Sequence, residues 1–274
     1  MHKFLLTVFC LLFTTVLFAQ DSEIKNIDPD RPTQNDASAV VPQGTFQLEN
    51  GFGMQRVTKK ELNAVEDEYR YPNASLRIGI FKIAELRFKA ALKHFQTEFT
   101  GDSANGSEVN QRKETGLGNT AIGTKIQLCQ NKGALPEAAF QVEVQFPWGS
   151  KQYDPEIPET RLRLACTNKF SDKVSLHYNL GFEWQNTQSE GGRKFDHNPQ
   201  FAVALSYAFN EKFKTYLETY GQKTQDASYE QSADIGFAYW VLPNLQLDAN
   251  FAIGLNEAAP DFFIETGISF RLAK

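Results

Sequence analysis

The chain has 274 residues, of which 28 are Lys or Arg and 33 are Asp or Glu, giving a net charge of −5 at pH 7. Its mean hydropathy is −0.42, and no stretch is rich in basic residues. This mild acidity disfavours a nucleic-acid-binding protein, and the length allows one large β domain or two smaller ones.

Residues 1–19 have the pattern of a secretory signal peptide. Lys3 provides a positive start, an apolar run extends from Phe4 to Phe18, and the small residue Ala19 marks the cleavage site. The run is short for a membrane-spanning helix, so we expect cleavage rather than a retained anchor. Cys10 lies inside the run and not after small residues at its end, which argues against a lipoprotein anchor.

Residues 20–42 show no hydrophobic period and are rich in Asp, Pro, Asn and Ser, so we predict an extended periplasmic leader ahead of the first strand. Cys129 and Cys166 remain in the mature chain. Export permits one disulfide between them, and two unpaired thiols are the alternative. No other stretch could span a membrane as a helix, so a membrane role would have to use strands.

Residues 43–274 alternate between apolar and small or polar side chains, with the period of two that is typical of β-strands. Between residues 174 and 185 the even positions are aliphatic or aromatic, whereas the odd positions are Ser, His, Asn, Gly, Glu and Gln. We predict about 12 strands by this pattern. In chain order they are Gly44–Gln55, Tyr69–Phe81, Glu85–Phe99, Gly118–Gln130, Glu137–Trp148, Thr160–Asn168, Val174–Gln185, Pro199–Phe209, Lys212–Gly221, Ala233–Val241, Leu245–Leu255 and Asp261–Leu272.

The predicted connections alternate in length. Short turns follow the even-numbered strands, at residues 82–84, 131–136, 170–173, 210–211 and 242–244. Longer polar loops follow most odd-numbered strands, at residues 56–68, 100–117, 149–159, 186–198 and 222–230. All long loops therefore fall at one end of the sheet, and both termini fall at the other. This layout indicates an all-β fold, a single antiparallel up-and-down transmembrane barrel in the outer membrane of a Gram-negative bacterium.

A secreted soluble β-sheet binding protein would show the same alternation. Three features favour lipid outside and a polar lumen inside. The apolar faces carry no charge, as a lipid-facing surface requires. Aromatic residues lie near strand ends, as in an interfacial girdle: Trp148, Trp184, Tyr207, Phe209 and Tyr239. The opposite face carries glycines, amides and charges of both signs.

The inward-facing charges and one histidine are the candidate channel-lining residues. They are Glu49, Arg77, Glu85, Arg87, Lys89, Lys125, Glu143, Arg161, Arg163, His177, Glu183, Glu218, Asp234, Asp248, Glu265 and Arg271. Arg77, Glu85 and Arg87 flank one short turn, so we expect them to cluster at the periplasmic mouth within reach of Glu49. Such charges either fill a narrow interior with ion pairs or form a polar path for a small solute.

The sequence shows no established catalytic motif, and we expect no enzymatic activity. A lumenal or membrane-surface hydrolase would need Ser, His and a third polar group within hydrogen-bond reach. His177 is the one mid-strand inward histidine, and its same-face neighbour Ser175 is a generic candidate. No metal-binding or phosphate-binding motif is present, so we expect neither a metal nor a cofactor.

Several segments resemble one family of bacterial outer-membrane barrels. They are residues 30–33 (DRPT), 41–52 (VPQGTFQLENGF), 76–80 (LRIGI), 85–87 (ELR), 116–119 (GLGN) and 243–248 (PNLQLD). The pattern is similar to that of the transporter family named after the phenol meta-degradation pathway, with Asn119 where that family usually has Asp. The resemblance implies a porin-like transport role for small solutes, aromatic or apolar compounds among them.

We therefore expect a monomeric barrel in outer-membrane lipid, inserted by the barrel-assembly machinery, that passes or binds a small-molecule solute of unknown identity.

Overall fold

The computed structural model describes residues 26–99, 111–130, 135–151, 153, 155–189, 192–223 and 229–272. The predicted signal peptide, parts of four outer loops and part of the short turn at 131–136 lie outside these residues. Twelve strands are present: β1(Phe46–Lys59), β2(Ala64–Phe81), β3(Ala84–Phe99), β4(Gln111–Cys129), β5(Glu137–Gln145), β6(Glu159–Lys169), β7(Val174–Ser189), β8(Gly192–Asn210), β9(Phe213–Lys223), β10(Tyr229–Leu242), β11(Leu245–Gly254) and β12(Phe262–Leu272).

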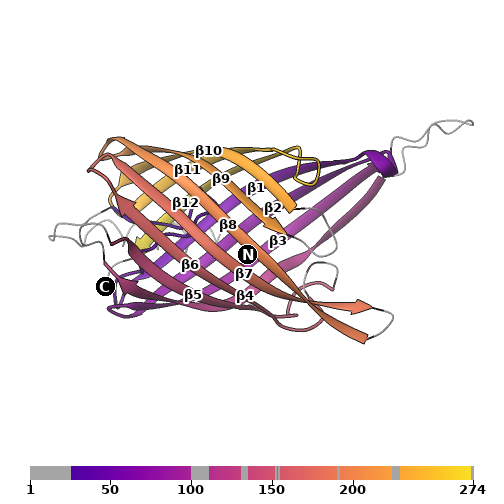
Figure 1. Ribbon diagram of the computed structural model, residues 1–274, viewed down its shortest axis with the longest axis horizontal. Helices are drawn as coiled ribbons and strands as arrows, with labels where there is room; N and C mark the ends of the chain where they lie inside the picture. Colours follow the sequence, from indigo (N-terminus) through magenta and orange to yellow (C-terminus); the bar gives the residue numbers. More distant parts are fainter. Residues whose placement is uncertain are drawn as a thin grey trace, which may run out of the picture.

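Each strand pairs antiparallel with its neighbour in the chain, and β1 pairs with β12, so the sheet closes into a barrel. Figure 1 shows the tilted strands, with the C-terminus at the end where the short turns lie and the long hairpins at the other end. The predicted all-β, twelve-stranded barrel is therefore confirmed. Closure leaves no unpaired sheet edge, which is the condition for strands to cross lipid. No helix in the described residues is long and apolar enough to span a membrane.

The two faces of the wall differ as the alternation predicts. On β10, Phe237 and Tyr239 are 40% and 46% exposed, whereas Ala238 between them is fully buried. The largest completely buried side chains include Arg77, Arg87 and Lys125, and not aromatic residues. The apolar residues therefore form the outer surface and the polar residues fill the inside. A soluble sheet with a dry apolar centre is contradicted.

Several strands extend beyond their predicted limits into the expected outer loops. β1 continues to Lys59 and β2 begins at Ala64, with a short 3-10 helix, η2(Lys60–Leu62), at the tip. Arg56 pairs with Asp67 across this hairpin through two 2.7 Å hydrogen bonds. Beyond the lipid both faces of a strand meet water, so the hydrogen-bond ladder continues without apolar alternation. The hydrophobic pattern therefore marks the lipid-crossing part of each strand and not its end.

β4 begins at Gln111, whereas the sequence predicted Gly118. The predicted start coincides with an irregularity inside the strand. The register with β3 shifts between Lys89 and Ala91, and Asn119 has a positive φ of 55°. Asn tolerates this left-handed backbone better than most residues, so the break in the pattern is a bulge and not a strand end.

The described part of the leader, residues 26–42, lies mostly inside the barrel, which differs from the expected extended periplasmic segment. Ile27 N donates to Pro243 O in a short turn at 2.8 Å, and Gly44 N donates to Gly79 O at 2.8 Å. The leader therefore enters and leaves at the short-turn end. The leader lies inside because its charged residues form ion pairs with buried charged groups of the barrel wall.

Candidate functional site

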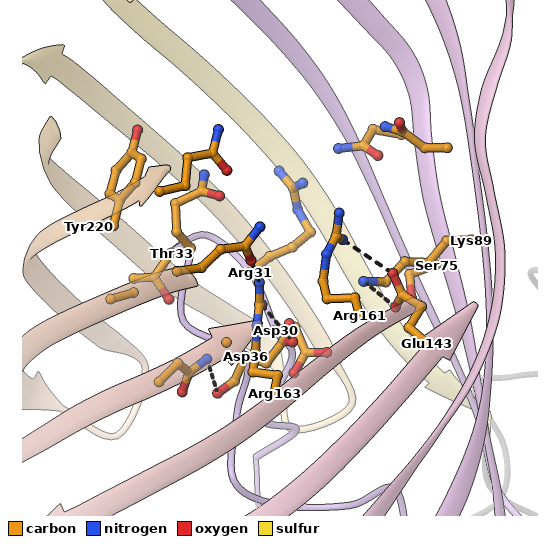
Figure 2. Close-up of a pocket in the computed structure, with 18 of the residues that line it drawn as sticks. Asp30, Arg31, Thr33, Asp36, Ser75, Lys89, Glu143, Arg161, Arg163 and Tyr220 are labelled. Atoms are coloured by element: carbon orange, nitrogen blue, oxygen red, sulfur yellow. Dashed lines mark hydrogen bonds and ion pairs between the residues drawn. The ribbon is translucent and has the colours of Figure 1, made fainter. Parts of the chain in front are cut away.

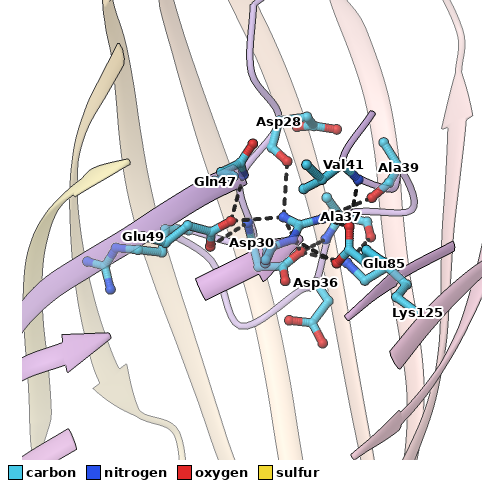
Figure 3. Close-up of polar contacts among 12 residues, drawn as sticks. Asp28, Asp30, Asp36, Ala37, Ala39, Val41, Gln47, Glu49, Glu85 and Lys125 are labelled. Atoms are coloured by element: carbon cyan, nitrogen blue, oxygen red, sulfur yellow. Dashed lines mark hydrogen bonds and ion pairs between the residues drawn. The ribbon is translucent and has the colours of Figure 1, made fainter. Parts of the chain in front are cut away.

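Asp30 of the leader is the centre of a buried ionic cluster (Figure 3). Lys125 Nζ lies 2.8 Å from Asp30 Oδ1, Arg87 Nη2 2.5 Å from Oδ2, and Arg77 Nη1 3.4 Å from Oδ1. Burial alone would raise the pKa of Asp30, but Arg77, Arg87 and Lys125 outweigh it and hold the pKa well below its usual value. The carboxylate is therefore ionised and fixed to three strands.

The wall carboxylates Glu49 and Glu85 complete this cluster. Arg77 Nε and Nη2 donate to Glu85 at 2.8 and 3.0 Å, and Arg77 Nη1 donates to Glu49 at 2.9 Å. Glu85 also accepts the backbone N–H of Val41 at 2.6 Å. The predicted clustering of Arg77, Glu85 and Arg87 near Glu49 is confirmed. A leader backbone group is part of it, which the sequence did not predict.

Arg31 extends to β11 and β12, on the far side of β1 from the basic residues that bind Asp30. Its Nη1 donates to Glu265 at 2.7 Å and its Nη2 to Asp248 at 3.1 Å. The guanidinium lies against the cross-strand pair Gly51 and Gly267, where an added Cβ atom at either position would overlap it. These two glycines thus leave the space in which Arg31 reaches both carboxylates.

The next leader residues bond to β9 through their backbone. Gln34 N donates to Glu218 Oε2 at 2.8 Å and Asn35 N to Oε1 at 3.0 Å, with a further bond from the Asn35 side chain. Asp234 is the cross-strand neighbour of Glu218 and accepts a hydrogen bond from Asn250 at 2.9 Å. These two buried carboxyl groups therefore receive N–H donors instead of a cation.

The leader then crosses to β6. Arg163 Nη1 donates to Asp36 at 2.7 Å, and Ser38 Oγ bonds to Thr167 Oγ1 at 2.9 Å. With the contacts above, the leader is bonded to strands on both sides of the barrel. It forms a floor across the lumen near the short-turn end.

A cavity of about 540 Å³ lies over this floor and is shown in Figure 2. Asp30, Arg31 and Asp36 line it from the leader, and charged or amide side chains line most of the wall. Lys89 Nζ lies 2.8 Å from Glu143, and Arg161 Nη2 lies 2.7 Å from Glu183. The side chains of Lys89 and Arg161 are 26% and 28% exposed, so this part of the lumen is accessible to water.

Comparison with known proteins identifies the family. Residues 29–272 match the model of the family described as "Putative MetA-pathway of phenol degradation". The chain belongs to this family. The match includes the leader from residue 29 onward and the whole barrel. Among curated proteins, none matches the sequence.

Several solved structures are similar to this chain. The COG4313 outer membrane channel from Pseudomonas putida F1 matches with a TM-score of 0.65 and 13% identity, covering 90% of this chain and 100% of that one. The transport unit of the autotransporter AIDA-I from Escherichia coli matches with a TM-score of 0.50 and 10% identity, covering 97% of each chain. The CymD monoaromatic hydrocarbon channel matches with a TM-score of 0.46 and 11% identity, covering 85% of this chain and 89% of that one. The predicted outer-membrane barrel is confirmed at the level of fold.

The structure places all the candidate channel-lining residues on the inner face, in two groups. Those that border the cavity are Glu49, Arg87, Lys89, Glu143, Arg161, Arg163 and Glu265. Those that do not border it are Arg77, Glu85, Lys125, His177, Glu183, Glu218, Asp234, Asp248 and Arg271. That any of them lines a conducting path stays a prediction. The leader residues Asp30, Arg31 and Asp36 were not among the candidates, although DRPT was noted as a family-like segment.

The geometry around His177 bears on the hydrolase alternative. His177 Nε2 lies 3.0 Å from Ser206 Oγ and Nδ1 lies 3.1 Å from Thr167 Oγ1. The neighbouring hydroxyl is thus that of Ser206 and not that of Ser175. Ser206 is completely buried, and neither it nor His177 borders the cavity. Among the described residues this pair therefore lies apart from the cavity, where a solute would enter.

Cys129 and Cys166 are both free thiols in the described structure. Cys129 is opposite Ala138 on β5, and Ala138 is opposite Cys166 on β6. The two cysteines are therefore two strand spacings apart, about 10 Å, which exceeds the reach of a disulfide. The predicted alternative of two unpaired thiols is the one observed.

Proposed function

We propose that this protein is an outer-membrane channel for small hydrophilic solutes, with a lumen narrowed by its own leader. The observation that carries this proposal is the polar cavity of about 540 Å³ inside a closed barrel, with Asp30, Arg31 and Asp36 as its floor. The name of the Pseudomonas putida relative, an outer membrane channel, agrees with this role.

The cavity lining bears on the kind of solute. Phe201 and Phe263 are the large apolar residues in it, and most of the remainder is charged or amide-bearing. An apolar solute would desolvate these groups without replacing their hydrogen bonds, which is unfavourable. The lining therefore favours polar solutes over the apolar compounds that the family resemblance suggested, and aromatic compounds fit if they carry polar groups.

The channel would act as a monomer in outer-membrane lipid, after insertion by the barrel-assembly machinery, and without a nucleic-acid partner, cofactor or catalytic step. Its apolar outer face, with Phe237 and Tyr239 exposed, supports contact with lipid.

Single-channel recording in planar bilayers tests the proposal. We expect a small conductance from the wild-type protein and a several-fold larger one from the double variant Asp30→Asn/Arg31→Gln, because the leader then loses its ion pairs to β2–β4 and to β11 and β12 and, among the described residues, keeps only those of Asp36. The matched control is Arg56→Gln/Asp67→Asn, which removes an ion pair of the outer hairpin and should leave conductance unchanged. A closed record from wild type and leader variant alike, together with no uptake of a pentose sugar by reconstituted vesicles, would show a structural role instead.

A further inference from the structure

The inner wall carries carboxylates on one side of the lumen. The consecutive strands β9 to β12 each place one on the inner face, namely Glu218, Asp234, Asp248 and Glu265, and all four are buried. Within the described residues, the cation paired with Asp248 and Glu265 is Arg31 of the leader, and Glu218 and Asp234 have no cation within 4.0 Å. In this acidic sector, Asp248 and Glu265 therefore take their positive charge from the leader, whereas Glu218 and Asp234 accept N–H donors from the leader and from Asn250.

The other side of the lumen has the opposite character. Arg77, Arg87 and Lys125, on β2, β3 and β4, converge on the carboxylate of Asp30. Among the described residues, the ion-pair partner of the fully buried Lys125 is Asp30. This basic sector takes part of its negative charge from the leader.

Asp30 and Arg31 are adjacent in the chain, so the leader presents a carboxylate and a guanidinium as one dipolar unit between the two sectors. Removing one partner of a buried ion pair is strongly unfavourable, because it leaves an uncompensated charge. The wall thus binds a carboxylate at β2 to β4 and a guanidinium at β11 and β12, both from adjacent leader residues. Both residues also border the cavity, so a solute that enters it meets the same two positions.

We propose that the lumen is a recognition site for dipolar solutes of amino-acid or dipeptide size, which carry a carboxylate together with a guanidinium or ammonium group. The leader occupies this site through Asp30 and Arg31, and the solute competes with it. This inference rests on the proposed channel only for the route by which the solute arrives.

Binding of short peptides to the purified protein in detergent tests the site directly. The probe is N-acetyl-Asp-Arg amide, compared with N-acetyl-Asn-Gln amide of similar size. The variant Asp30→Asn/Arg31→Gln has a leader that lacks both charges. In equilibrium dialysis it should bind the charged peptide at least ~10-fold more tightly than the neutral peptide. The same peptide should raise the unfolding temperature of this variant, because a ligand that binds only the folded state stabilises it. Equal binding of the two peptides overturns the inference.

A wall variant locates the binding. In the leader variant Asp30→Asn/Arg31→Gln, the further substitutions Asp248→Asn/Glu265→Gln should abolish the preference for the Arg-containing peptide. The further substitution Asp67→Asn in the outer hairpin should leave that preference unchanged. If the leader variant does not fold, the wild-type protein serves in bilayers: the charged peptide should increase conductance by displacing the leader, and the neutral peptide should not. A conductance that responds equally to both peptides would overturn the dipolar-solute site and leave the proposed channel function standing. Charge-selective peptide binding by a protein that shows no conductance would support the site and overturn the channel function.

Discussion

At the scale of single residues, the contact between Arg31 and the glycine pair gives a sharp test of the leader's position. Gly51→Ala places a methyl group where the guanidinium lies, so Arg31 must move and its bonds to Asp248 and Glu265 weaken. We expect a loss of about 1–3 kcal/mol in unfolding free energy, measured by urea denaturation in detergent micelles. The control is Gly181→Ala, whose added Cβ meets Gln200 atoms at 3.3 Å. Equal effects at both positions would contradict this account.

Asp30 predicts how stability depends on pH. Its pKa is held below the usual value, so its contribution is complete above the unfolded pKa and is lost as the pH falls through the folded pKa. Asp30→Asn should cost about 3 kcal/mol at neutral pH. The difference between wild type and variant should be the same at pH about 7 and about 5, and should shrink only below about pH 4. Urea midpoints at each pH measure it, and a difference already halved at pH about 5 would disagree.

At the scale of elements, the leader is the segment whose movement would matter. Ser38 Oγ lies 2.9 Å from Thr167 Oγ1, so cysteines at both positions should form a disulfide that fixes the leader to β6. In a Cys129→Ala/Cys166→Ala background, we expect the oxidised Ser38→Cys/Thr167→Cys protein to stay at the low conductance even with charged peptide present. Reduction should restore the response. A peptide response that is unaffected by oxidation would show that the leader does not have to move there.

The outer hairpin of β1 and β2 differs from the leader in how its ion pairs act. Arg56 and Asp67 are bidentate, but the Arg56 side chain is 42% exposed, so water screens the pair. The leader pairs are buried and each joins distant parts of the chain. Burial thus separates the two roles: the exposed pair extends a hairpin, and the buried pairs hold the leader against the wall.

At the scale of the whole molecule, the barrel could be predicted from sequence because it depends on local alternation. The faces of β10 follow from the identity of neighbours such as Phe237 and Ala238, and the surrounding medium decides which face lies outside. The leader could not be predicted in this way, because it has no periodicity. The partner of Arg31 is 217 residues away at Asp248, and that contact depends on the register of the whole barrel. The signal that was available is the row of inward carboxylates Glu218, Asp234, Asp248 and Glu265 on consecutive strands β9 to β12.

The lipid-facing surface leads to the last prediction. Leu180 lies mid-strand on β7, its side chain points outward, and it is 61% exposed. A lysine near the bilayer midplane costs ~2–4 kcal/mol, and the cost falls to ~0–1 kcal/mol near the interface. We therefore expect Leu180→Lys to destabilise the barrel by that larger amount in lipid vesicles, whereas Leu242→Lys at the short-turn end should cost much less. Urea-dependent refolding into vesicles measures both. Similar small costs at the two positions would mean that this face meets water, because position along the strand matters only if lipid surrounds its middle.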